Sequence, residues 1–161
     1  MKIPEITIEE KEFRIIYIRF RGSYVAFRKN SRKLFKELFD FATKNNLIEN
    51  GITKVLTVYD DNPFATGTEK LRTSVAMTVP KDINIIESGN VCILEIKGKF
   101  GIGHFEINAK EYEKAWQYMY QKWLFKENQI PRDAAPFEMY IDEPPKNFKD
   151  KSQTDIYIPI Q

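Results

Sequence analysis

The sequence has few of the residues that build metal centres or disulfide-stabilised folds. Its 161 residues include one cysteine, Cys92, and one histidine, His104. A single cysteine excludes an intrachain disulfide and a cysteine-rich zinc site. A single histidine excludes a multi-histidine metal centre. A Cys–His hydrolase would have to use Cys92 together with His104. We therefore expect neither a metal nor any other cofactor in this protein.

An excess of charge of one sign is also missing. The 25 Lys and Arg residues are balanced by 23 Asp and Glu, for a formal net charge of +2. Phosphate contacts need a concentrated basic surface, so this balance argues against direct binding to nucleic acid. No apolar run approaches the roughly 20 residues that cross a bilayer, and the first residues lack the apolar core of a signal peptide. The sequence thus predicts a cytoplasmic protein without a membrane partner.

Aromatic residues, in contrast, are plentiful, with 12 Phe, 8 Tyr and 2 Trp. Most aromatic rings of a domain belong to its core, and a chain of this length buries a full core without disulfides or metals. Concave ligand sites also use aromatic walls, and this chain has more rings than a small core needs. The composition favours one domain with an aromatic binding site.

Strand and helix patterns follow one another in an order that occurs twice. The first half predicts a strand at 13–20, a helix at 31–44 and strands at 55–59 and 73–79. The second half predicts a strand at 91–96, a helix at 108–123 opened by an Asn108–Glu111 capping box, and strands at 137–141 and 154–160. We interpret residues 1–161 as one domain made by internal duplication, with halves at about 1–84 and 85–161.

Short matches between the halves support this interpretation. They pair Gly22-Ser23-Tyr24 with Gly98-Lys99-Phe100, residues 59–63 with 140–144, and Val79-Pro80 with Ile158-Pro159. Two strand–helix–strand–strand units that pair side by side bury their apolar faces as an antiparallel sheet with two helices on one face. The predicted fold class is therefore α+β with pseudo-twofold symmetry, and a groove on the axis is a candidate pocket.

One position breaks the match between the halves, because Thr57 corresponds to Glu138. Strand alternation places Glu138 and Tyr140 on the same face. A carboxylate inside an apolar strand is costly if it is buried unpaired. We expect it to pair with a base such as Arg72 or Arg132, or to receive a cationic ligand; a solvated strand glutamate is the alternative.

The helix predicted at 108–123 carries an apolar seam that is most simply core, although Trp116 could also line a pocket. The seam consists of Tyr112, Trp116, Met119 and Trp123. His104, which we place in a loop after Gly101-Ile102-Gly103, is interpreted as a surface histidine rather than a haem ligand. The glycines before it lack the spacing of a dinucleotide-binding fingerprint.

Three parts of the chain resemble the bacterial GyrI-like small-molecule-binding family. That family includes gyrase-inhibitor-type proteins and the effector-binding domains of AraC-type and MerR-type multidrug transcription regulators. The similar segments are 17–24 (opening strand and Gly-x-Tyr turn), 59–63 with 69–72 (mid-chain motif), and 136–144 with 154–160 (C-terminal signature). The resemblance covers essentially the whole chain in the family's motif order. One departure is Ser74, near which the family usually has an aspartate.

The resemblance implies a duplicated β-α-β-β fold whose central aromatic cleft holds a glutamate that attracts cationic, lipophilic compounds. The motif match places that glutamate at Glu138. Ring faces around a bound cation each add roughly 0.5–2 kcal/mol of attraction. The expected ligand contacts are Glu138, Tyr140, Trp116, Tyr24, Tyr59, Phe64, Phe100 and Tyr120.

No helix-turn-helix precedes the domain in this sequence. We therefore expect a stand-alone effector- or xenobiotic-binding protein, monomeric or homodimeric, whose candidate protein partners are DNA gyrase and a separate regulator. Two alternatives stay open. One is a hydrolase of cyclopropane-bearing genotoxins with Glu138 as the base, and the other is an inhibitor that binds DNA gyrase. Binding is preferred over catalysis, but both would use the same residues.

Overall fold

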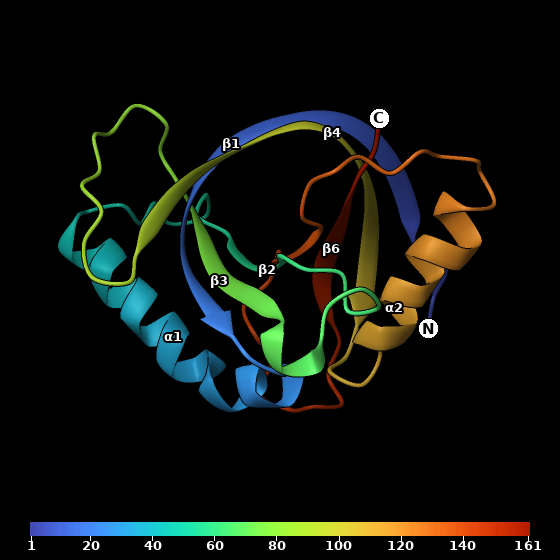
Figure 1. Ribbon diagram of the computed structural model, residues 1–161, viewed down its shortest axis with the longest axis horizontal. Helices are drawn as coiled ribbons and strands as arrows, with labels where there is room; N and C mark the ends of the chain where they lie inside the picture. Colours follow the sequence, from blue (N-terminus) through green and yellow to red (C-terminus); the bar gives the residue numbers. More distant parts are fainter. The chain divides into compact units, whose positions relative to one another are not determined.

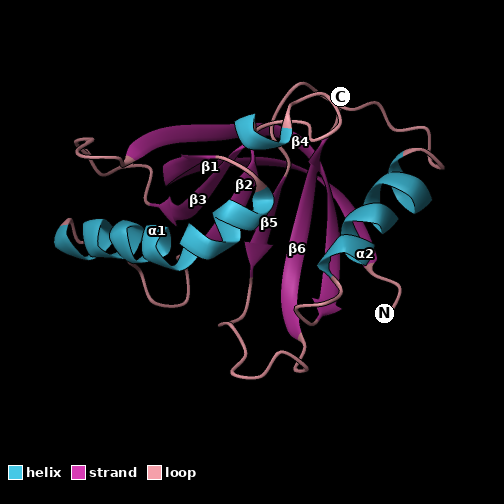
Figure 2. Ribbon diagram, turned by 60° about the horizontal axis from the view of Figure 1, so that its bottom comes forward, coloured by secondary structure: helices cyan, strands magenta, loops and turns pink.

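Six strands and two α-helices make up the computed structural model, which describes residues 1–161 (Figures 1 and 2). They are β1 (Glu5–Arg21), α1 (Tyr24–Lys44), β2 (Val55–Tyr59), β3 (Arg72–Val79), β4 (Cys92–Ile107), α2 (Tyr112–Gln117), β5 (Phe137–Tyr140) and β6 (Ser152–Pro159). A short 3-10 turn, η1 (Thr68–Lys70), precedes β3, and a π-helical segment, η2 (Tyr118–Leu124), continues α2. The predicted α+β class with antiparallel strands is confirmed. Neither helix combines the length and the apolar composition that a membrane-spanning segment needs.

The chain divides into two compact units, which we call the α1 unit and the α2 unit. The α1 unit is Glu12–Lys97, and the α2 unit is Met1–Lys11 together with Gly98–Gln161. The long strands β1 and β4 contribute residues to both units. The first eleven residues thus belong with the C-terminal part of the chain, which a division into halves at 1–84 and 85–161 does not anticipate.

In the α1 unit the strands lie in the order β1–β3–β2. β3 is antiparallel to both neighbours, with Phe20 opposite Thr73 on one side and Tyr59 opposite Thr73 on the other. Helix α1 buries Phe27, Leu38 and Ala42 in the core of this unit. The helix begins at Tyr24, earlier than the predicted residue 31, because the Ser23 hydroxyl caps it and accepts a 3.1 Å hydrogen bond from the Ala26 amide.

In the α2 unit the strands lie in the equivalent order, β4–β6–β5. Phe105 and Tyr140 flank Thr154 of β6 from opposite sides. Along the chain, the order strand, helix, strand, strand occurs twice, as the sequence predicted, while twofold symmetry stays a prediction. Descent from one duplicated ancestor stays a prediction.

Two of the short matches between the halves are wrong. The pairs Tyr59–Thr73 and Tyr140–Thr154 align the units, and Ile160 then stands where Val79 does, six residues beyond each threonine. The match of Val79-Pro80 to Ile158-Pro159 is therefore shifted by two residues. Gly98-Lys99-Phe100 lies inside β4, whereas Gly22-Ser23-Tyr24 lies where β1 ends and α1 begins.

Strand β4 does not end at Ile96, as the sequence predicted, but continues through three glycines to Ile107. A methyl group at Gly101 would fall inside the ring of Trp123, and one at Gly103 would collide with Met119. These glycines therefore let η2 approach the strand closely. As a consequence His104 lies in a strand, and its predicted loop position is wrong.

The helical region of the second unit is shorter and less regular than predicted. α2 begins at Tyr112 instead of residue 108 and passes into the π-helical segment at Tyr118. Half of the capping box is present, since the Asn108 amide donates to Glu111 Oε1 at 3.1 Å. Asn108 Oδ1, however, accepts from the Lys110 amide instead of the Glu111 amide.

We predict that Gly101→Ala lowers the free energy of unfolding by about 3 kcal/mol, because Trp123 and β4 must separate to admit the methyl group. Chemical denaturation measures this change. Gly67→Ala is the matched control, since its φ of −57° suits alanine and no atom lies within 4 Å of the added methyl. Its unfolding free energy should stay within about 0.5 kcal/mol of wild type. Equal stability of the two variants would contradict the close packing.

Candidate functional site

The carboxyl group of Glu138 is held away from water. Glu138 lies in the centre of β5, opposite Ile156 of β6, and only 4% of the residue is exposed. This burial excludes the interpretation of Glu138 as a solvated strand residue. Strand alternation turns its side chain to the same face of β5 as Tyr140.

Tyr112, the first residue of α2, stands beside this face. Its ring meets that of Tyr140 edge to face, with centroids 6.5 Å apart, and its hydroxyl lies 2.9 Å from Thr154 Oγ1. Burial raises the pKa of Tyr112 above the usual 10.0; the hydrogen bond with Thr154 acts in the opposite direction, and the negative charge of Glu138 adds to the rise.

The sequence assigned Tyr112 to the core seam and did not include it among the ligand contacts. Its position depends on the register that sets Thr154 opposite Tyr140 and on the start of α2 at Tyr112. Both are non-local features. The α1 unit offers a parallel, because Tyr24 is the first residue of α1 as Tyr112 is of α2. The sequence matches, however, paired Tyr24 with Phe100 and not with Tyr112.

Trp116 and Tyr120 form a stacked pair along the helix. Their ring centroids are 6.3 Å apart at an interplanar angle of 22°, and both rings are half-buried against the apolar cluster beneath α2. Within that cluster the fully covered seam residues are Met119 and Trp123. The seam is therefore core at these two positions and partly accessible at Trp116.

Phe100 is a core residue. It is 1% exposed and packs with Phe137 and Tyr157 at centroid distances of 5.6 and 5.5 Å. Arg132, one of the two bases considered for Glu138, lies 5.0 Å over the Phe100 ring and donates to the backbone carbonyl of Lys99. Phe100 thus has an evident packing role.

In the α1 unit, Tyr24 and Tyr59 form an edge-to-face pair at 5.8 Å, as Tyr112 and Tyr140 do in the α2 unit. Burial raises the pKa of Tyr24, and the charge of Asp61 adds to the rise. Phe64, in the loop after β2, is 99% exposed.

The other base considered for Glu138, Arg72, forms an ion pair with Asp61 at 2.7 Å. Two residues further along β3, the Ser74 hydroxyl donates to Asp60 at 2.7 Å. Ser74 therefore makes a polar contact at this strand end.

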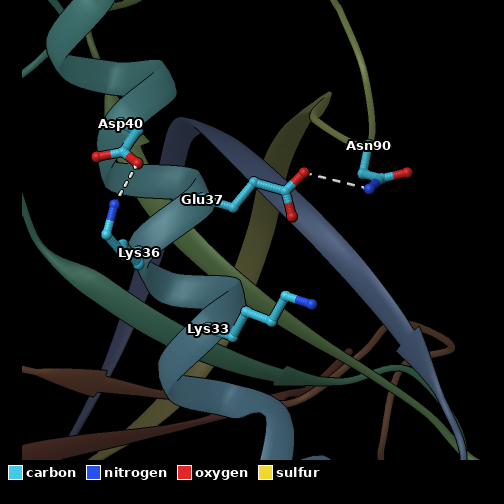
Figure 3. A pocket seen from close by; sticks show the side chains of 5 residues that line it. All are labelled: Lys33, Lys36, Glu37, Asp40 and Asn90. Atoms are coloured by element: carbon cyan, nitrogen blue, oxygen red, sulfur yellow. Dashed lines mark hydrogen bonds and ion pairs between the residues drawn. The ribbon is translucent and has the colours of Figure 1, made fainter.

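An open depression on α1 does not suit an amphipathic ligand. It is lined by Lys33, Lys36, Glu37, Asp40 and Asn90 (Figure 3). Lys36 pairs with Asp40 at 2.8 Å, and Asn90 donates to Glu37 at 3.2 Å. The depression has no aromatic wall, and its acidic groups already have partners.

Comparison with known proteins identifies relatives along the whole chain. The family described as the GyrI-like small molecule binding domain matches residues 4–161. YosT of Bacillus subtilis, a protein of the SPbeta prophage whose name describes a transcriptional regulator, is 25% identical over 158 residues, covering 98% of this chain and 99% of YosT. A DNA gyrase inhibitor of Yersinia enterocolitica is 25% identical over 139 residues, covering 84% of this chain and 85% of the inhibitor.

Solved structures share the fold at low sequence identity. The EcmrR C-terminal domain superposes with a TM-score of 0.76 at 16% identity and 99% coverage of both chains. In the EcmrR–DNA complex, this chain spans 58% of the longer EcmrR chain. SAV2435 bound to tetraphenylphosphonium gives 0.60 at 12% identity, covering 98% of this chain and 94% of SAV2435. A hydrolase from Listeria innocua gives 0.65 at 9% identity, covering 99% and 92%.

We predict that the hydroxyls of Tyr112 and Thr154 are energetically coupled. Tyr112→Phe and Thr154→Val should each destabilise the protein, while the double variant loses about 1 kcal/mol less than the sum of the two. The reason is that each single variant leaves a buried hydroxyl without its partner. Denaturant unfolding of the four proteins measures the coupling, and a value near zero would mean that the two hydroxyls are not bonded.

Proposed function

The chain belongs to the family of GyrI-like small-molecule-binding domains, and we propose that it binds amphipathic, cationic aromatic compounds next to Glu138. The observation that carries this proposal is the position of Glu138, 4% exposed on the face of β5 that also bears Tyr140. An acidic side chain in such a place favours a ligand that brings positive charge and apolar surface together.

The attraction has two physical sources. A carboxylate screened from water interacts with a cation more strongly than an exposed one does, because the effective dielectric constant around it is lower. The faces of Tyr112 and Tyr140 add cation–π attraction when a cation lies within about 6 Å of them. The apolar part of the ligand would cover aromatic surface that water contacts in the free protein.

The remaining predicted contacts differ in how well their surroundings suit this role. Trp116 and Tyr120 offer a stacked, half-buried aromatic surface in the α2 unit. Tyr24 and Tyr59 offer a similar pair in the α1 unit. We propose Trp116 and Tyr120 as contacts of the ligand beside Glu138, and Tyr24 and Tyr59 as an aromatic contact surface of the α1 unit by itself, whereas the packing of Phe100 favours a structural role.

Glu138→Gln should weaken the binding of tetraphenylphosphonium by tenfold or more, because glutamine keeps the shape of the side chain and removes its charge. SAV2435, which shares the fold, is known with this lipophilic cation bound, so the cation is a suitable probe. Calorimetric titration at one ionic strength measures the change. Equal affinity of wild type and Glu138→Gln would contradict the proposal.

Two controls make the result specific. Glu143→Gln removes an exposed carboxylate from the loop after β5 and should leave the affinity within about twofold of wild type, since exposed charges are well screened. Triphenylphosphine oxide, a neutral aromatic probe, should bind wild type and Glu138→Gln equally. A loss of both probes in Glu138→Gln would indicate a damaged fold.

Two further activities are suggested by the names of similar proteins. One solved structure with this fold is a hydrolase, and a relative is a DNA gyrase inhibitor. Loss of a cyclopropane-bearing substrate during incubation with wild type, but not with Glu138→Gln, would favour hydrolysis. Inhibition of gyrase supercoiling by the protein would favour the second activity. Neither outcome is expected if the protein only binds small molecules.

A further inference from the structure

Four polar side chains of the α2 unit form a hydrogen-bonded chain that the proposed ligand site does not use. On β1, the Thr7 hydroxyl donates to Glu9 Oε2 at 2.8 Å. The same Thr7 oxygen lies 3.0 Å from Nε2 of His104 on β4. On its other side, His104 Nδ1 lies 2.9 Å from Oδ1 of Asp155, its partner in the register of β4 and β6. Three strands are thus joined through one imidazole ring.

Counting hydrogens assigns a proton to this chain. The Thr7 hydroxyl has one hydrogen, which it gives to Glu9, and this bond holds the pKa of the Glu9 carboxyl below its usual value. The hydrogen between Thr7 and His104 must therefore come from Nε2. Asp155, as a carboxylate, accepts from Nδ1. A histidine that donates from both nitrogens is an imidazolium.

Burial raises the pKa of Asp155, and the hydrogen bond from His104 counteracts the rise. A proton that shifted along this bond would sit on Asp155 instead of Nδ1. In either arrangement the His104–Asp155 pair holds one proton more than a neutral ring beside a carboxylate.

The other charged or titratable groups near the imidazole ring do not supply enough positive charge to take the place of this proton. Lys11 pairs with Glu9 at 3.4 Å, and Glu106 follows His104 on the same face of β4. Tyr157, two residues beyond Asp155 on β6, stays neutral because burial raises its pKa to about 12. Lys11 thus lies near two carboxyl groups, Glu9 and Asp155, so an added proton on the His104–Asp155 pair reduces the local imbalance.

We propose that His104 and Asp155 form a proton-operated latch that fastens residues 5–11 of β1 to the rest of the α2 unit. When the proton leaves, the one remaining ring hydrogen stays on Nδ1, where the Asp155 carboxylate accepts it, so Nε2 has no hydrogen to give to Thr7. Thr7 must then either lose this bond or turn its hydroxyl away from Glu9. One hydrogen bond disappears in both cases, so the strand is held less tightly at higher pH.

The latch is connected through Ile6 to the apolar cluster beneath α2. Ile6 is adjacent to Thr7 and points to the opposite face of β1. It packs against the cluster that contains Met119 and Trp123, on which Tyr112 and Trp116 also rest. Loosening this strand at higher pH would therefore loosen the support of the α2 aromatic residues.

Amide hydrogen exchange at residues 6–10 tests the latch directly. Protection is measured at about pH 5.5 and about pH 8, on either side of the range in which histidine titrates, and corrected for the intrinsic exchange rate at each pH. In wild type we expect protection to be about fivefold lower at the higher pH, the effect of one hydrogen bond. In Thr7→Val, which keeps the branched shape, protection should be low at both pH values.

Thr73→Val is the matched control. It removes the hydroxyl of a fully buried threonine on β3 that has no hydrogen-bond partner, and it should keep the pH dependence of wild type. Absence of any pH effect in wild type, or an equal effect in wild type and Thr7→Val, would overturn the proposal.

The single histidine provides a test that needs no variant. Nitrogen-15 NMR of the imidazole in the wild-type protein reports the protonation of each ring nitrogen. In the fastened latch both nitrogens carry a hydrogen, and in the released latch only one does. An unprotonated Nε2 at the lower pH of the exchange experiment would refute the latch even if Thr7→Val failed to fold.

Discussion

Burial of an acidic side chain is the constraint around which the candidate site is built. Taking a carboxylate out of water costs several kcal/mol unless nearby groups compensate, and Glu138 is almost fully covered in the middle of a short strand. Under the proposed function, a ligand cation would gain from this charge while its apolar groups contact the tyrosines beside it.

The rest of the α2 unit determines where those tyrosines stand. Gly101 and Gly103 let the helix approach β4, with Trp123 and Met119 filling the space that side chains would occupy. The start of the helix then lies over the end of β5, and Tyr112 meets Tyr140. In the α1 unit the same ring pair forms between Tyr24 and Tyr59. In that unit the position that corresponds to Glu138 is occupied by the uncharged Thr57. The two units thus share an aromatic arrangement and differ in charge.

Much of this was predictable from the sequence, for identifiable reasons. β2 was predicted with its observed bounds because β-branched residues and a following turn mark it clearly. The same alternation of residues placed Glu138 inside a strand. β4 was cut short because its glycines look like a turn, and only the packing of Trp123 over Gly101 and of Met119 over Gly103 explains these two glycines. Tyr112 and His104 were misjudged for a related reason, since their partners, Thr154 and Asp155, are brought close by strand register and not by sequence spacing.

The central claim is that charge, and not only shape, selects the ligand. Tetraphenylphosphonium and tetraphenylborate have nearly the same size and aromatic surface but carry opposite charges. Calorimetric titration of both ions into the wild-type protein therefore isolates the effect of charge. The account predicts that the cation binds at least a hundredfold more tightly than the anion. Equal affinities would mean that aromatic surface alone drives binding, and tighter binding of the anion would contradict the role assigned to Glu138.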